Sequence, residues 1–241
     1  MKKILVSLLA AGSMHMTAAS AQELDVTITN LTNAVYFTPL LVSAHNGNTH
    51  LFQAGHTASA ELQAMAEGGD TSGLQAHLAS IGADSVANPN GGLLAPGATT
   101  TAHLRTHKGN RRLSVVAMLL PTNDGFAGLN AIRIPRKHGT YTYYMNGYDA
   151  GTEANDEIIN GGGAPGVPGI PADPGGNSGS GASGVTTTEH NTTVHIHRGT
   201  LGDMDLNGGI SDLDSRVHHW LNPVAKVVIT VRGRKHHEHD D

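Results

Sequence analysis

The sequence predicts an all-β fold, an antiparallel sandwich or barrel of short strands. Apolar and polar residues alternate with a period of two along several segments, which is the pattern of strands with one buried face. Turns rich in Gly and Pro separate these segments. The 241 residues include no cysteine, so packing or bound ions must stabilise the fold in place of disulfide bonds.

The first residues have the features of a secretory signal peptide. Lys2 and Lys3 precede an apolar run, and small residues follow it, so we expect cleavage after Ala21 and a secreted or periplasmic protein. The apolar run is too short to span a bilayer and no later segment is long enough, so no membrane span is expected. The net charge is −5 and the basic residues are scattered along the sequence, which argues against nucleic acid as a partner.

Two strands and then helical spacing follow the signal peptide. Residues 24–30 alternate strictly, and residues 34–43 form a second strand in which Pro39 indicates an edge or a bend. Together they predict an opening hairpin. Between His56 and Ile81 the spacing becomes helical and two segments each end in Gly, so we expect one or two short helices.

Six more strands are expected, at 99–106, 111–120, 129–135, 140–146, 192–198 and 224–234. A Gly-, Pro- and Ser-rich segment at 161–184 interrupts them and has almost nothing to bury, so it is predicted to be a disordered insertion. The expected organisation is a signal peptide at 1–21, one domain at 22–235 that contains the insertion, and a His- and Asp-rich tail at 236–241.

Two Gly-rich turns carry carboxylates where strands end. Asp124 lies in the first turn, and Asp149 and Glu153 flank an Ala-Gly-Thr sequence in the second. Ca²⁺ takes carboxylate and carbonyl oxygens as ligands, and Gly allows the chain to curl so that carboxylates converge. Asp-Gly is also a common turn pair, so a shared metal site and a solvated turn both remain open. Asp156 and Glu157 are further candidate ligands.

Three stretches carry a resemblance to a known family: "AMLLPTNDGFAGLNAI", "YDAGTE" and "LNPVAKVVITV". They resemble the spondin domain, the N-terminal module of F-spondin and mindin, over most of the mature chain. The resemblance implies a C2-like antiparallel β-sandwich whose apical loops bind one calcium ion through Asp124, Asp149 and Glu153. It also implies a non-catalytic role in binding or adhesion to a cell-surface or matrix component, protein or glycan. The chain differs from the family pattern at Gly125, where an aromatic residue is usual, and at Glu153, where Asp is common.

A second acidic run, "DMDLNGGISDLD", resembles an EF-hand calcium loop. Asp203, Asp205 and Asn207 occupy its first, third and fifth positions, and Asp214 stands where a Glu is usual. Neither flank has the pattern of an amphipathic helix. The alternative is therefore a polar hairpin whose Asp side chains bond their own backbone.

Histidines offer an alternative function, that of an exported copper or zinc protein or metalloenzyme. His195 and His197 lie two apart on a predicted strand and so point the same way, which suits a metal pair. Other histidines could complete such a site: His103, His107, His190, His218 and His219. Exposed strand-face histidines are the simpler interpretation. The sequence has no GxSxG, HExxH or phosphate-loop motif and no cysteine, so a non-catalytic protein is expected.

Overall fold

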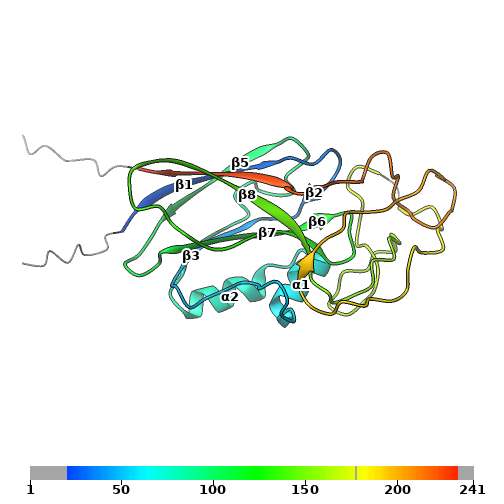
Figure 1. The fold of residues 1–241 in the computed structure, drawn as a ribbon, viewed down its shortest axis with the longest axis horizontal. Helices are drawn as coiled ribbons and strands as arrows, with labels where there is room; N and C mark the ends of the chain where they lie inside the picture. Colours follow the sequence, from blue (N-terminus) through cyan, green and yellow to red (C-terminus); the bar gives the residue numbers. More distant parts are fainter. Residues whose placement is uncertain (1–20, 177, 233–241) are drawn as a thin grey trace, which may run out of the picture.

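Ten antiparallel strands form one continuous sheet in the computed structural model, which describes residues 21–176 and 178–232 (Figure 1). Their order is β4-β3-β6-β7-β8-β10-β1-β5, with the short strands β2 and β9 paired to β6 and β8. The strands are β1 (Glu23–Asn30), β2 (Tyr36–Phe37), β3 (Leu41–His45), β4 (Asp84–Ala87), β5 (Thr99–Arg105), β6 (Arg112–Leu120), β7 (Gly125–Arg133), β8 (Gly139–Asp149), β9 (His195–Ile196) and β10 (Ala225–Val231). The expected signal peptide, apart from Ala21, and the expected tail at 236–241 lie outside the described residues.

The sheet folds over itself at β8. The first part of β8 pairs with β10 from Gly139 to Met145, and its last part pairs with β7 from Asn146 to Asp149. The two halves of the sheet lie face to face as layers (Figure 1), and the end strands β4 and β5 contact each other. The mostly β, antiparallel fold with two short helices is thus confirmed, and its strands form a single, nearly closed, barrel-like sheet.

Two apolar cores lie on opposite sides of β6. Its side chains alternate between them: Leu113, Val115, Ala117 and Leu119 fill the core between the layers, and Val116, Met118 and Leu120 face outward. Helices α1 (Ala60–Gly68) and α2 (Ser72–Ser80) cover this outer face (Figure 1). Ser59 caps the start of α1 and Gly69, with φ of 73°, ends it in the left-handed conformation that Gly favours. Neither helix has the length and apolarity for a bilayer crossing, as far as the described residues go.

The predicted opening hairpin is wrong. β1 pairs with β10 and β5, and the predicted second strand is split at Pro39 into β2 and β3, which pair with β6. The buried side chain of Asn30 turns the chain away from β1, since its amide donates to the carbonyls of Val35 and Leu94. A buried amide satisfied in this way fixes a turn that alternation alone does not indicate.

Long loops gather at one end of the barrel, and the first and last described residues lie at the other (Figure 1). We call the loop end the apical end; it contains Asp149, the last residue of β8, and the loops at 121–124, 150–194 and 197–224. The insertion at 161–184, predicted to be disordered, lies here as coil. It buries more than its composition suggests, because Ile170 packs against Ile159 and Leu213. Asn177 is outside the described residues.

Candidate functional site

The pairing of β7 with β8 brings Asp124 and Asp149 together at the apical end. Gly125 stands opposite Asp149 in the register, and the N–H of Ala150 donates to the carbonyl of Asp124 at 3.2 Å. Both side chains are buried, with exposed fractions of 0% and 2%. Like charges so placed in a buried site disfavour each other's ionised form.

Asp124 has one carboxylate oxygen that is satisfied and one that is not. Its Oδ2 accepts hydrogen bonds from the N–H and the hydroxyl of Thr152, at 2.8 and 3.1 Å. Its Oδ1 is buried and has no donor among the described residues. Burial first, and the charge of Asp149 second, raise the pKa of Asp124 to about 7.

Glu153, like Asp124, has one carboxylate oxygen that accepts a hydrogen bond and one that does not. Its Oε2 accepts a hydrogen bond from the N–H of Gly169 at 3.0 Å, while its Oε1 is buried with no donor in the described part of the chain. Burial raises the pKa of Glu153 to about 8, and the charges of Asp124 and Glu67 add to the effect. The third predicted ligand therefore lies near the first, and it also holds the Gly/Pro-rich insertion.

Asp149 is more fully bonded, and its partners include residues that the sequence analysis did not select. Its Oδ1 accepts from the N–H of Gly151 at 2.8 Å and its Oδ2 from the side-chain amide of Asn155 at 2.7 Å. The Nε2 of His195 lies 3.7 Å from the same Oδ2. Burial raises the pKa of Asp149. The amide of Asn155 also reaches Glu189, at 3.5 Å. Asn155 lies in the acidic "EANDE" stretch, and this position could have marked it as a candidate site residue. Nothing in the sequence connects Glu189 with the site.

Gly125, one of the departures from the family pattern, is required by the turn before it. A Cβ at this position would lie 2.6 Å from the hydroxyl oxygen of Thr122. That hydroxyl accepts the N–H of Gly125 at 3.0 Å and donates to the carbonyl of Leu119 at 2.6 Å. A side chain at this position would displace Thr122 from the bonds that close the turn before Asp124. The aromatic Phe126 follows one residue later.

These features fit a cation that prefers oxygen ligands. Buried carboxylate oxygens without donors on Asp124 and Glu153 are free to coordinate, and the carboxylate of Asp149 adds charge beside them. Ca²⁺ completes its shell with neutral oxygens and water. As placed, no three His, Asp or Glu side chains within residues 21–176 and 178–232 form a ready metal cage. An ion here would thus draw on neutral oxygens as well as on acidic side chains.

The second acidic loop bonds mainly to its own backbone. One oxygen of Asp203 accepts from the N–H groups of Ile210 and Ser211, at 2.7 and 3.0 Å, and Asp205 accepts from the N–H of Asn207 at 3.0 Å. Asp214 forms a bidentate pair with Arg216, at 2.9 and 2.7 Å. These contacts favour the polar hairpin over the EF-hand alternative.

We therefore expect the paired substitutions Asp203→Asn and Asp205→Asn to leave the number of bound calcium ions unchanged. The reason is that Asp203 and Asp205 already accept backbone N–H groups, and Asp214 is paired with Arg216. Isothermal titration calorimetry on the variant and the wild type measures the stoichiometry. Loss of one ion in the variant would instead identify this loop as a second site.

The histidines proposed for a transition metal have separate partners. His195 contacts the carbonyl of Thr193 through Nδ1, at 2.7 Å, and faces Asp149. His197 accepts the N–H of Gly199 at 2.9 Å, packs on Trp220 with ring centroids 5.0 Å apart, and is buried, which lowers its pKa to about 3. The rest are dispersed: His103 pairs with Asp25, His107 with Asp84, His218 with Asp173, and His219 contacts the carbonyl of Thr200. Of the candidate histidines with these side-chain contacts, His195 is the one that lies beside the carboxylate site.

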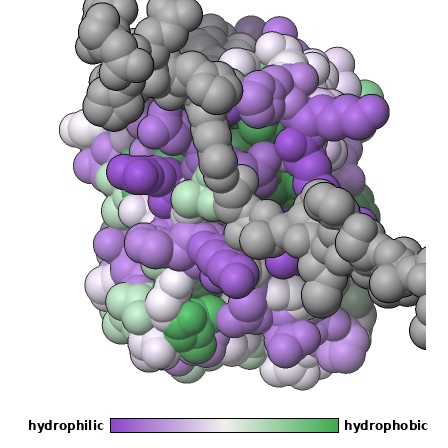
Figure 2. Space-filling model, turned by 90° about the vertical axis from the view of Figure 1, so that its left-hand side faces the viewer, coloured by the Kyte–Doolittle hydropathy of each residue, from purple (hydrophilic) through white to green (hydrophobic). Residues whose placement is uncertain are grey.

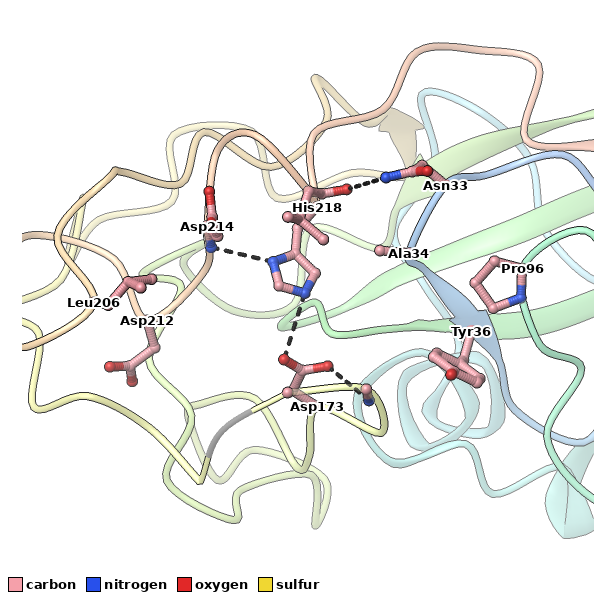
Figure 3. Close-up of a pocket in the computed structure, with 12 residues that line it drawn as sticks. Asn33, Ala34, Tyr36, Pro96, Asp173, Leu206, Asp212, Asp214 and His218 are labelled. Atoms are coloured by element: carbon pink, nitrogen blue, oxygen red, sulfur yellow. Dashed lines mark hydrogen bonds and ion pairs between the residues drawn. The ribbon is translucent and has the colours of Figure 1, made fainter.

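A hollow of about 340 Å³ lies at the apical end beside β2 (Figure 3). In it, the Nε2 of His218 points to Asp173 at 3.4 Å, while its Nδ1 accepts the backbone N–H of Asp214 at 3.1 Å. Both ring nitrogens are engaged, so His218 offers no free nitrogen for general base catalysis. It joins the insertion to the loop that follows Asp203.

Comparison with known protein families gives one match. The model of the Spondin_N family matches residues 29–157, which extend from β1 through Asp124, Asp149 and Glu153. The second acidic loop lies outside the matched region. No protein with a curated description matches the sequence.

Proposed function

The chain belongs to the Spondin_N family, whose domains are typically extracellular, non-catalytic binding modules, and we propose that it is a calcium-binding module of this kind. In this proposal Asp124, Asp149 and Glu153 hold one calcium ion. The module then binds or adheres to a cell-surface or matrix component at the cell envelope or outside the cell. The two-layer sheet with its apical loops supports the C2-like sandwich that the family resemblance implies.

One observation carries the proposal: Asp124 is fully buried, faces the charge of Asp149, and keeps one oxygen without a donor. Such a group is costly in a folded protein unless it is protonated or paired with a cation. A divalent cation would supply positive charge to both carboxylates, and its binding free energy would add to the stability of the fold.

The ion would also fix the apical loops as a binding surface. Asp156, close after Glu153, accepts from the side-chain amide of Asn123 at 2.7 Å. Glu157 accepts from the N–H groups of Leu201 and Gly202, at 2.6 and 2.8 Å. Charged and polar contacts thus connect the carboxylate turns to the loop after β9. That loop presents exposed apolar side chains, Leu201, Met204, Leu206, Ile210 and Leu221, a composition suited to a protein partner.

The proposal predicts that EGTA lowers the melting temperature of the wild type and that excess calcium restores it. At a free calcium concentration about 100 times the Kd, one bound ion contributes about 2.7 kcal/mol. For a domain of this size that corresponds to a shift of roughly 5–10 °C. The Asp149→Asn variant is expected to lose the response. If Asp149→Asn and the wild type gave the same calcium-dependent shift, Asp149 would not be a ligand.

A transition-metal protein is the second candidate, because His195 presents a ring nitrogen to Asp149 at 3.7 Å. Elemental analysis of the purified mature protein separates the two. Calcium at one equivalent supports the calcium module. Copper or zinc at one equivalent that persists after removal of residues 236–241, and is lost in His195→Ala, supports the alternative.

A further inference from the structure

Basic side chains that are scattered along the sequence come together at the end of the barrel opposite the carboxylate loops. Of the fifteen Lys and Arg residues in the chain, eleven lie between residues 21 and 232, and eight of these eleven are at this end. We define the basic end as Arg105, Lys108, Arg111, Arg112, Arg133, Arg136, Lys137 and Arg232. We propose that the basic end binds an acidic polysaccharide that carries sulfate or phosphate groups.

Hydrogen bonds between distant segments bring these residues together. Gln22 donates its N–H to the hydroxyl of Thr106 at 3.0 Å and its side-chain amide to the carbonyl of Pro135 at 2.9 Å, and its own carbonyl accepts the N–H of Thr106 at 2.8 Å. The N–H of Ile134 donates to the carbonyl of Arg111 at 2.9 Å. The loops at 106–111 and 134–138 therefore lie beside the start of β1. Arg232 joins them because its N–H donates to the carbonyl of Glu23 at 2.9 Å.

The positive charge of the basic end is largely uncompensated. Of its neighbouring carboxylates, Asp25 pairs with Arg232 at 2.6 Å and with His103, and Asp84 pairs with His107. Glu23 stands opposite Arg105 in the pairing of β1 with β5, the one carboxylate left to offset the remaining basic side chains among the described residues there. The other seven basic side chains form no ion pair with any described residue. Arg112 even stands directly opposite Arg133 in the pairing of β6 with β7, and like charges so placed are destabilising. An anionic ligand would relieve this repulsion.

Charge is segregated along the barrel. The apical end contains the three predicted ligands and eight further carboxylates, but among the described residues there only Arg198 and Arg216 carry positive charge. The eight further carboxylates are those of Asp156, Glu157, Asp173, Glu189, Asp203, Asp205, Asp212 and Asp214. Such a separation orients a protein in the field of a polyanion. The basic end would face the polymer and the apical loops would point away from it, free to bind another partner.

The composition of the basic end favours a polysaccharide over a membrane or a nucleic acid. Six of its eight residues are Arg, whose planar guanidinium pairs with sulfate or phosphate through two hydrogen bonds. This end is largely hydrophilic where the described residues are visible (Figure 2), and the segments 105–112 and 133–138 expose no large apolar side chain and contain no Phe, Tyr or Trp. Membrane docking uses exposed apolar side chains, and single-stranded nucleic acids stack on aromatic ones.

The test measures binding of fluorescently labelled heparin, a sulfated polysaccharide, to the mature full-length protein by anisotropy at several salt concentrations. The Arg136→Gln, Lys137→Gln double variant is expected to bind roughly tenfold more weakly, and the slope of log Kd against log salt concentration is expected to fall by about one to two. Arg216→Gln, Lys226→Gln removes the same two residue types elsewhere on the molecule, and this matched control is expected to bind like the wild type.

Several outcomes would overturn the proposal: no binding of heparin at low salt, equal losses in the two double variants, or tighter binding of duplex DNA or of anionic phospholipid vesicles than of heparin. Circular dichroism spectra and melting curves establish that both variants are folded. Binding is also expected to be the same in Asp149→Asn, since that residue lies at the other end. The result is therefore independent of whether calcium binds.

Discussion

The Asp124→Asn variant is expected to be more stable than the wild type in EGTA and less stable in excess calcium. In the absence of an ion, the substitution removes a buried charge that faces Asp149 and has a pKa raised to about 7. A pKa shift of this size corresponds to a penalty of about 2–4 kcal/mol at pH 8, so the melting temperature in EGTA should rise by roughly 5–10 °C. In calcium the variant lacks a ligand and loses the stabilisation by the ion.

The raised pKa of Asp124 also predicts how the stability difference between the wild type and Asp124→Asn depends on pH. The pKa of Asp124 is higher in the folded protein than the ordinary aspartate value of 3.8, so the folded state holds this proton more tightly than the unfolded state does. The wild type without calcium therefore loses stability relative to the variant as the pH rises from about 4 to about 7, and the difference then levels off. Thermal melts in EGTA at pH 4, 6 and 8 measure it.

Glu23→Gln is the control for loss of one negative charge, because Glu23 is exposed and lies at the opposite end of the barrel. It is expected to change the melting temperature little, with or without calcium. If Asp124→Asn lowered the melting temperature in EGTA, the like-charge description of the site would be wrong.

The Phe126→Ala variant is expected to be destabilised by about 3–5 kcal/mol, as is usual for a large aromatic side chain removed from a core. Phe126 is fully buried, with its ring centroid 5.0 Å from that of Phe52 and 5.6 Å from that of Tyr148. The three rings belong to the core beneath the helices. Urea denaturation measures this loss in the free energy of unfolding: if the m-value is the same in both proteins, the midpoint urea concentration of the variant gives the difference.

The matched control is Tyr144→Ala, which removes an aromatic side chain that is 57% exposed on β8. Its effect is expected to stay within about 1 kcal/mol. Phe126 also lies two residues after Asp124 on the first strand of the site. We therefore expect Phe126→Ala to weaken calcium binding, whereas Tyr144→Ala should not. Equal destabilisation by both variants would contradict the description of this core.

Much of the fold could be predicted because strand alternation reflects burial directly. The period-two pattern of residues 225–231 predicts a strand, and β10 forms there with every odd-numbered residue buried. The helical spacing of residues 60–68 and 72–80 predicts helices, and α1 and α2 form there. Strand partners were not predictable in the same way. The hairpin prediction failed because Asn30 forms its turn through long-range bonds to Val35 and Leu94, which have no counterpart in local patterning.

The candidate site was likewise predictable only where local sequence indicates it. Asp124, Asp149 and Glu153 could be selected from their turns, and the register of β7 and β8 brings the first two together. Asn155 and Glu189 approach the site through the fold of the apical loops, so spacing could not select Glu189. The basic end was missed because its residues come from three segments, 105–112, 133–137 and Arg232, that only the closed sheet places side by side. Basic residues that are scattered along the sequence can therefore still gather on one surface of the folded protein.

The number of calcium ions bound by the wild type tests the central proposal most directly. The protein is stripped with chelator and titrated with calcium by isothermal calorimetry beside the Asp124→Asn, Asp149→Asn double variant. We predict one ion per wild-type chain and none in the double variant. No heat of binding in a folded wild type, or an ion retained by the double variant, would contradict a calcium site at these carboxylates.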